Sequence, residues 1–255
     1  MSAWSTRRQL SFVILFIVAL AIIVFVVIVS NRRVPTCSDS ISNQGELDVD
    51  CGGPCAKVCK VEVSDVVVIW TRIFKIREGF YDVAAYIENP NPFSVYKYVY
   101  KFRIYDADNI PVKDVMGIVN LNPHERVLLF DSGVNVGFRI PVRAFLSFPD
   151  EPLWQRAVVI EPPNLVISNE RLDKTFGIAL YATIINNSLE VVNDIELAAF
   201  LYDKDGNVVN VSKSRVDTLN KDEQKEIVFT WPEESSIDIV TSDIVPRVER
   251  QIGNE

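Results

Sequence analysis

Histidine is almost absent from this sequence, and so are the short motifs that mark common enzyme sites. The 255 residues include one histidine, His124, and they contain neither a Gly-x-Ser-x-Gly nucleophile elbow nor a glycine-rich phosphate-binding loop. A Ser-His-Asp system could use only His124, which follows Asn122-Pro123 at an expected turn and is more typical of a solvated side chain. A pair of catalytic carboxylates stays open, because any two acids can meet in space. On balance we expect no enzymatic activity.

An excess of basic residues is also lacking. Lys and Arg together number 26 against 34 Asp and Glu, which gives a formal net charge of −8. Because binding to nucleic acid needs a basic face, this balance argues against a nucleic-acid partner.

Charge is missing altogether from the run between Leu10 and Val29, in which Ser11 is the only polar residue. About twenty residues at a rise of about 1.5 Å each span the roughly 30 Å hydrocarbon layer of a bilayer. A cleaved signal peptide is the alternative, but its apolar region is usually about 7–15 residues long and ends in small residues. Here the run ends in Ser30-Asn31-Arg32-Arg33, so we expect a signal-anchor that crosses the membrane once.

Cysteine occurs in only one short stretch, at Cys37, Cys51, Cys55 and Cys59. Four cysteines packed so closely favour two disulfides, with three pairings open, and disulfides persist outside the cytosol. The arginines before and after the apolar run balance each other, so the cysteines decide the orientation. We expect the N-terminus to be cytoplasmic and the C-terminal region extracytoplasmic. Zinc held by the four thiols is the alternative that an oxidising compartment and the uneven spacing disfavour.

The chain is therefore expected to have five segments. These are a cytoplasmic stub (1–9), a transmembrane helix (10–30), a linker with the cysteine module (31–60), a first β-domain (61–162) and a second β-domain with a C-terminal tail (163–255). The boundary between the two β-domains is placed at Pro162-Pro163, which lacks two backbone donors and suits a stiff joint.

The two β-domains are copies of one unit. At an offset of 97 residues, Ala85-Tyr86-Ile87-Glu88-Asn89 aligns with Ala182-Thr183-Ile184-Ile185-Asn186, and Ile104-Tyr105-Asp106 aligns with Leu201-Tyr202-Asp203. Apolar residues alternate with period 2 in both copies, which is typical of half-buried strands. In each copy, strands are linked by an Asn-rich turn, Asn89-Pro90-Asn91-Pro92 or Asn186-Asn187-Ser188, and then by an Asp-rich turn. Short strands at this spacing predict a mainly β chain with tandem sandwiches.

The second copy resembles the FxLYD family of extracellular domains, through Phe200-Leu201-Tyr202-Asp203 and the Asp205-Gly206 turn. The first copy is similar to that family and also to the water-stress type of late-embryogenesis-abundant domain, in which an Asn-Pro-Asn turn is common. Phe102 and Phe200 nevertheless fall one register apart, on opposite strand faces. The resemblance implies tandem immunoglobulin-like sandwiches over most of residues 61–245 and no catalytic activity.

The cysteine module resembles short cysteine and acid modules that precede sandwich domains in secreted proteins and usually carry Gly where Ser40 stands. Hard oxygen ligands lie close together here, as calcium requires, and the candidate ligands are Asp39, Asn43, Glu46, Asp48 and Asp50. The alternative is an acidic solvated loop held by two disulfides. We expect the whole protein to be a structural or protein-interaction module on the membrane, with protein partners that the sequence does not identify. The alternative role is a sensing or assembly subunit of a membrane complex.

Overall fold

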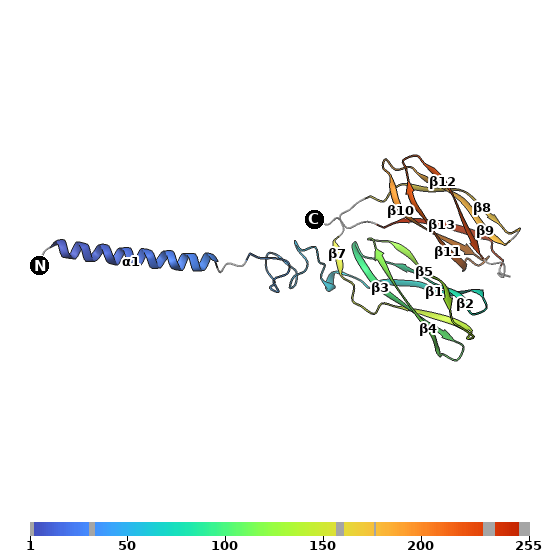
Figure 1. The fold of residues 1–255 in the computed structure, drawn as a ribbon, viewed down its shortest axis with the longest axis horizontal. Helices are drawn as coiled ribbons and strands as arrows, with labels where there is room; N and C mark the ends of the chain where they lie inside the picture. The colour runs from blue at the N-terminus through green and yellow to red at the C-terminus, as the bar shows by residue number, and fades with distance from the viewer. Residues whose placement is uncertain (1–2, 31–33, 157–160, 176, 232–237, 250–255) are drawn as a thin grey trace. The chain divides into compact units, whose positions relative to one another are not determined.

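A computed structural model of the chain describes residues 3–30, 34–156, 161–175, 177–231 and 238–249. It confirms the predicted fold class, which is mainly β with one N-terminal helix (Figure 1). The chain divides into two compact units, Met1–Cys55 and Ala56–Glu255, and each is described by itself.

The first unit holds helix α1 (Ala3–Ser30) and most of the cysteine module. Within α1, the segment Leu10–Val29 is the one described helix that is long and apolar enough to cross a membrane. None of this segment is buried against protein, and its Leu, Ile, Val and Phe side chains are all exposed. A helix that is apolar on every side has no polar face to show to water, so it needs an apolar surrounding.

The second unit begins with a short 3₁₀ helix, η1 (Lys60–Glu62), and continues as two β-sandwiches made only of antiparallel strands. The strands of the first sandwich are β1 (Val67–Arg77), β2 (Phe80–Glu88), β3 (Phe93–Asp106), β4 (Pro111–Leu121), β5 (Arg126–Asn135), β6 (Pro141–Ser147) and β7 (Trp154–Arg156). The strands of the second are β8 (Leu165–Asp173), β9 (Ile178–Asn186), β10 (Val192–Tyr202), β11 (Val208–Leu219), β12 (Gln224–Trp231) and β13 (Thr241–Val248).

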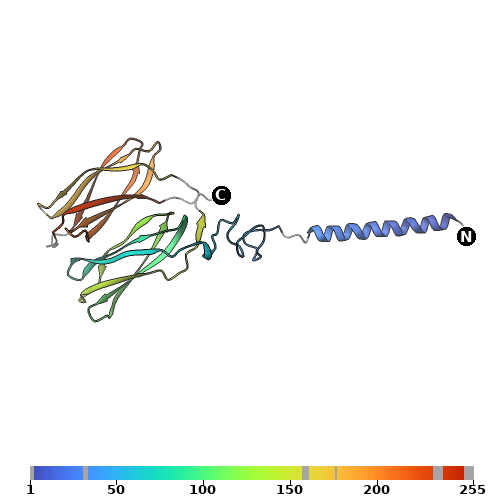
Figure 2. The same ribbon diagram turned by 180° about the vertical axis from the view of Figure 1, so that it is seen from behind.

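The two sandwiches have the same topology, as the internal repeat requires. In the first, a sheet of order β1-β2-β5 packs on a sheet of order β4-β3-β6, and β7 pairs with the start of β3. In the second, a sheet of order β12-β9-β8 packs on a sheet of order β11-β10-β13 (Figure 2). The Asp-rich turns at 106–109 and 203–207 each close a hairpin, β3 with β4 and β10 with β11.

The Asn-rich turns connect different sheets. Strand β2 lies in one sheet of the first sandwich and β3 in the other, so the segment from Asn89 to Pro92 crosses between the sheets. Asn89 is fully buried, and its Nδ2 donates hydrogen bonds to the carbonyl oxygens of Phe93 and Asn122 at 2.8 and 2.7 Å. Asn186 is fully buried at the equivalent position of the second sandwich, where its Nδ2 donates to three carbonyl oxygens. Each asparagine side chain therefore donates hydrogen bonds to backbone carbonyl oxygens where the chain crosses between the sheets and regular strand pairing ends.

Each sandwich has its own apolar core, formed by the alternating residues of its strands. In the first sandwich the fully buried side chains include Val83, Ile87, Phe102, Ile104 and Leu121. In the second they include Leu180, Ile184, Ile195, Leu197, Leu201 and Leu219.

A third apolar cluster joins the two sandwiches. The outer face of the β1-β2-β5 sheet contributes Phe74, Ala84 and Leu128, and the outer face of the β11-β10-β13 sheet contributes Phe200, Val208 and Val211. The ring of Phe200 lies edge-on to Trp70 and Tyr86, with centroid distances of 6.4 and 5.3 Å. Phe200 and Phe102 thus lie on opposite faces of their strands, as predicted, because Phe102 fills the core of one sandwich and Phe200 packs against the other sandwich.

Candidate functional site

The site predicted from the sequence is the cysteine module, and all four of its cysteines are in disulfides. Cys37 and Cys55 form a disulfide with a Cα–Cα distance of 5.6 Å, and Cys51 and Cys59 are also disulfide-bonded. No cysteine is free, so thiolate zinc binding has no ligand here. The Cys37–Cys55 bond, with a sequence separation of 18, stabilises its loop by roughly 3 kcal/mol in the chain-entropy model.

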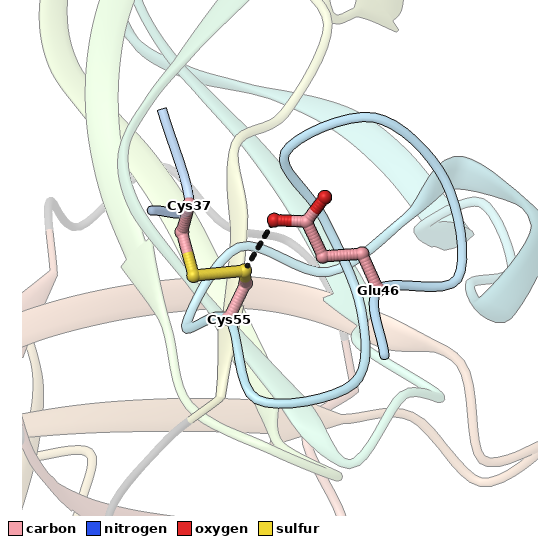
Figure 3. A group of neighbouring side chains, drawn as sticks. All are labelled: Cys37, Glu46 and Cys55. Atoms are coloured by element: carbon pink, nitrogen blue, oxygen red, sulfur yellow. Dashed lines mark hydrogen bonds between the residues drawn. A yellow bond between two sulfur atoms is a disulfide. The ribbon is translucent and has the colours of Figure 1, made fainter. Parts of the chain in front are cut away.

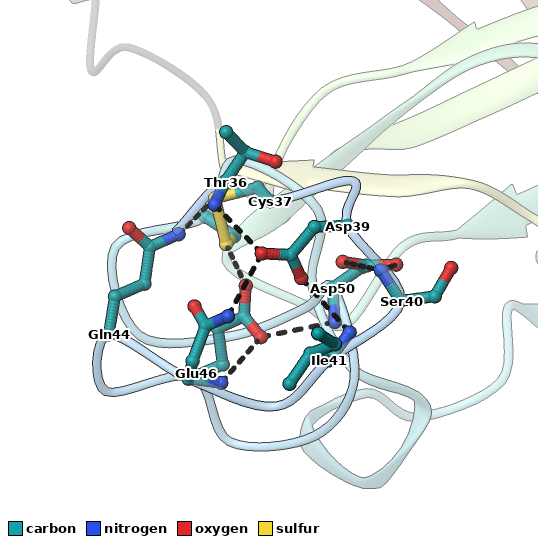
Figure 4. Close-up of a disulfide and its surroundings, with 10 residues drawn as sticks. Thr36, Cys37, Asp39, Ser40, Ile41, Gln44, Glu46 and Asp50 are labelled. Atoms are coloured by element: carbon teal, nitrogen blue, oxygen red, sulfur yellow. Dashed lines mark hydrogen bonds between the residues drawn. A yellow bond between two sulfur atoms is a disulfide. The ribbon is translucent and has the colours of Figure 1, made fainter. Parts of the chain in front are cut away.

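The predicted ligands Asp39 and Asp50 hold the turns of this loop (Figure 4). Asp39 accepts hydrogen bonds from the backbone N–H of Thr36 and Ile41 at 3.2 and 3.0 Å and from the side-chain amide of Asn43 at 2.9 Å. Both carboxylate oxygens of Asp50 accept from the N–H of Ser40 at 3.0 Å. The segment has no regular secondary structure, so these carboxylates accept the backbone N–H groups that carbonyl oxygens would accept in a helix or a sheet.

The backbone of Ser40 has a conformation that favours Gly. Its φ is +60°, in the left-handed region that Gly adopts without a steric cost. The two hydrogen bonds from its N–H to Asp50 hold a serine in that conformation.

The predicted ligand Glu46 connects two parts of the loop through its carboxylate. Its Oε2 accepts from the N–H groups of Asn43 and Asp50, both at 3.3 Å. Its Oε1 lies 3.2 Å from the Sγ of Cys55 (Figure 3), a disulfide sulfur that has no proton to donate. Glu46, Cys37 and Cys55 form the one described group of three ligand-type atoms within 4.8 Å, and two of those atoms are bonded to each other, so this group is not a metal site.

Calcium binding by the module stays a prediction. Asp39, Glu46 and Asp50 are engaged with backbone N–H groups, and Asp48 Oδ1 accepts from the N–H of Val49 at 2.7 Å. Among the buried side-chain oxygen and nitrogen atoms that the structure describes, only Oδ1 of Asn43 has no hydrogen-bond partner. The hydrogen bonds account for the acidic residues without a cation, so the stapled-loop alternative explains the geometry more fully.

A second candidate site, which the sequence did not reveal, is a groove of about 600 Å³ between the sandwiches. Three stretches of strand or turn line it, namely residues 71–75 of β1, residues 142–144 of β6, and Asp203 with residues 207–210 around the β10–β11 turn. Its charged lining residues are Arg72, Lys75, Arg143 and Asp203. Positive charge therefore dominates this groove in a chain of net charge −8.

The four charged groups of the groove differ in how they are held. Arg72 donates to the carbonyl oxygen of Val208 and so ties β1 to β11, and Lys75 pairs with Glu78 at 2.7 Å. Asp203 accepts the N–H groups of its own turn, chiefly that of Asn207, and these bonds lower the pKa of its carboxyl group. Arg143 is exposed, and its guanidinium forms no ion pair with any residue that the structure describes.

One end of the interface between the sandwiches is polar and is organised by Arg247 of β13. Its side chain is only 9% exposed and pairs with Glu125 of the first sandwich at 3.0 Å and with Glu196 of the second at 2.9 Å. It also donates to the carbonyl oxygen of Asn120. Burial opposes the charge on Glu196, but Lys213 and Arg247 outweigh it and lower the pKa of this carboxyl. This network complements the apolar cluster, so the sandwiches are joined by both kinds of contact.

The buried Tyr100 and the partly buried Asp131 form a further pair of titratable groups, and their role is structural. Tyr100 donates its hydroxyl to Asp131 at 3.0 Å, and burial raises the pKa of both groups. Neither residue lines the groove. His124 lies at a turn with φ +51°, where its N–H donates to the carbonyl oxygen of Asn91. No nucleophile–base pair with His124 occurs within the described ranges.

No protein-family model matches this chain, and no curated protein matches it significantly.

Proposed function

We propose that this protein is a non-enzymatic interaction module that a single transmembrane helix anchors in a membrane. The observation that carries the proposal is α1. Its segment Leu10–Val29 exposes apolar side chains on every side, and burying them in lipid is the arrangement that removes this surface from water.

The disulfides support an extracytoplasmic location for the rest of the chain. Disulfides persist where thiols are not kept reduced, and all four cysteines are bonded. With the N-terminus in the cytoplasm, the membrane would separate α1's first residues from the cysteine module and the sandwiches.

The stacked sandwiches support a binding role. The apolar cluster around Phe200 and the Arg247 network fix two domains into one block, so surfaces contributed by both domains keep their relative positions. A preorganised surface loses little conformational entropy when a partner binds.

Protease treatment of intact cells tests this proposal. In cells that express the full chain with a C-terminal epitope, external protease should remove the epitope and leave a small membrane fragment that contains α1. Mass spectrometry of the mature N-terminus should find residues that precede Leu10, because a signal-anchor is not cleaved. An epitope protected in intact cells but digested after permeabilisation would overturn the orientation, and a mature chain beginning after Val29 would overturn the anchor.

Native cross-linking then addresses the interaction role. The full chain should be recovered from solubilised membranes in a defined complex. A matched chain with Phe200→Ala, which loosens the block, should recover less of the same partner if the two sandwiches bind together. Recovery of the full chain as a free monomer under the same cross-linking would contradict an interaction role.

A further inference from the structure

We infer that the groove between the sandwiches binds an extended, acidic polypeptide segment of a partner protein by strand addition. The inference rests on the proposed interaction function and names its site and the chemistry of its partner. Four observations carry it: unpaired strand edges, an uninterrupted register, a positive lining and an apolar rim.

The walls of the groove are strand edges that form no ladder hydrogen bonds on the groove side, although β1 and β6 lie close to each other there. Among the strands that the structure describes, β1 pairs only with β2, β6 only with β3, and β11 only with β10. Residues of all three strands line the groove. An edge strand presents a row of N–H and C=O groups that can pair with another extended chain.

Strand β1 is regular where it borders the groove. Its pairing with β2 runs without a register shift from Trp70 to Lys75, and this stretch contains neither Pro nor Gly. Six such residues span about 20 Å and turn about half of their backbone groups outward. The matching ligand is therefore an extended segment of about six residues.

Two other edge strands of the unit, β13 and β8, carry features that prevent pairing, whereas β12 is regular from Gln224 to Trp231. Pro246 lies within β13, and the register of β8 shifts after Ser168, next to Asn169 with φ +54°. Such prolines and bulges protect exposed edges. The regular edge of β1 at the groove lacks this protection.

Charge selects the partner. Arg72, Lys75 and Arg143 line the groove against a single acid, Asp203, whose oxygens already accept the amides of its own turn. An acidic segment is therefore attracted, and a basic one is repelled. Successive side chains of a strand point to opposite faces, so every second residue of the segment would carry the acid.

The rim of the groove suits small apolar side chains between the acids. Val142 of β6 is 55% exposed beside Arg143, and Val209 of β11, which also packs against the core of the second sandwich, is half-buried. The best ligand thus alternates acidic residues with Val or Thr.

Fluorescence anisotropy on the full chain in detergent micelles tests the inference. The probe is a labelled seven-residue peptide that alternates Glu with Val or Thr, and saturable binding is expected. Two control peptides separate the causes: one has Lys in place of Glu, and one has N-methyl groups on alternate backbone amides. Both should fail to bind, because the first reverses the charge and the second removes strand hydrogen bonds. Unchanged binding of the N-methylated peptide would overturn strand addition, and so would no binding of the acidic probe.

Two variants at an exposed position locate the site. Arg143→Gln should weaken the acidic probe severalfold and Arg143→Glu about tenfold, as expected when one ion pair is first lost and then replaced by repulsion. The matched control is Arg171→Glu on β8, an exposed arginine that does not line the groove, and it should bind like the parent chain. Equal binding by Arg143→Glu and the parent chain would place the peptide elsewhere and overturn the assignment.

The outcome is independent of the test of the proposed function. A failed anchor would change the protease and N-terminal results and leave this titration intact. A failed titration with a correctly anchored and cross-linked chain would remove the groove as the site and leave the proposed function standing.

Discussion

The buried asparagine of the second sandwich gives the sharpest test of how this fold is held together. Asn186 is fully buried, and its Nδ2 donates to the carbonyl oxygens of Glu190, Leu219 and Asn220 at 2.8, 3.0 and 3.2 Å. Its Oδ1 accepts the N–H of Ser188 at 2.9 Å. The side chain of Asn186 thus links the segment that crosses between the two sheets, after β9, to the end of β11.

Replacing Asn186 with Ala removes these bonds and leaves carbonyl oxygens without a donor. A net hydrogen bond contributes about 1 kcal/mol, and a buried group left unsatisfied costs about 1–3 kcal/mol. Since the bonds are weakly additive, we expect the free energy of unfolding to fall by about 3–5 kcal/mol, at the upper end for a single substitution. Asn186→Asp should fall by a similar amount, because a carboxylate accepts but does not donate.

Equilibrium urea denaturation of the oxidised full chain in detergent micelles, in which all disulfides stay intact, measures this change in the compact unit Ala56–Glu255 through the shift of the midpoint. The matched control is Asn187→Ala, since the neighbouring Asn187 has an exposed side chain and uses only its backbone N–H. If Asn186→Ala destabilised the unit no more than Asn187→Ala, the crossing would not depend on the buried amide and this reasoning would be refuted.

Three further predictions concern the interface, the partly buried Asp131 and the cysteine module. Phe200→Ala should cost about 3–5 kcal/mol and split one calorimetric transition into two, whereas a single transition at the parent temperature would contradict a shared core. Burial raises the pKa of Asp131 above its unfolded value, so the stability contributed by this group rises as pH falls from neutral through the folded pKa; Asp131→Asn should lose that rise, and an unchanged pH series would refute it. Asp50→Ala should lower the melting temperature of the oxidised full chain equally in EDTA and in millimolar calcium, and a calcium-dependent rise in the parent chain alone would establish the predicted metal site.

Much of the architecture follows from local patterns in the sequence. The uncharged run from Leu10 to Val29 predicts α1, and the offset of 97 residues predicts two sandwiches of the same topology. The Asp-rich turns predict the two hairpins correctly, because turn chemistry is a property of a few consecutive residues.

The stacking of the sandwiches was missed, although the sequence contains a signal for it. A period of 2 identifies one buried face of β2 and β10, yet the runs Val83-Ala84-Ala85 and Leu197-Ala198-Ala199-Phe200 are apolar on both faces. Such continuous runs are typical of strands that are buried on both sides. They indicate that a second surface covers each strand, but they do not indicate which surface covers it.

The predicted calcium ligands show a different limit of prediction from sequence. Oxygen acceptors at close spacing serve equally to bind a hard cation and to accept backbone N–H groups in a loop without strands or helices. Only the positions of the N–H groups distinguish these roles, as with the N–H of Ser40 on Asp50. The groove could not be predicted at all, because its walls come from strands that are far apart in the sequence.

The repeat also shows how two copies of one unit come to present different outer faces. The sheet that carries Phe200 packs on the first sandwich, and the equivalent sheet of the first sandwich presents Lys101 and Arg103 at the positions of Ala198 and Phe200. Arg103 forms a two-point ion pair with Asp114 on this exposed face, at 2.8 and 2.7 Å. A head-to-tail contact between unlike faces can repeat without limit, but docking another sandwich on this face would require burying a solvated ion pair. The same two positions therefore join the sandwiches in one copy and carry a solvated ion pair in the other.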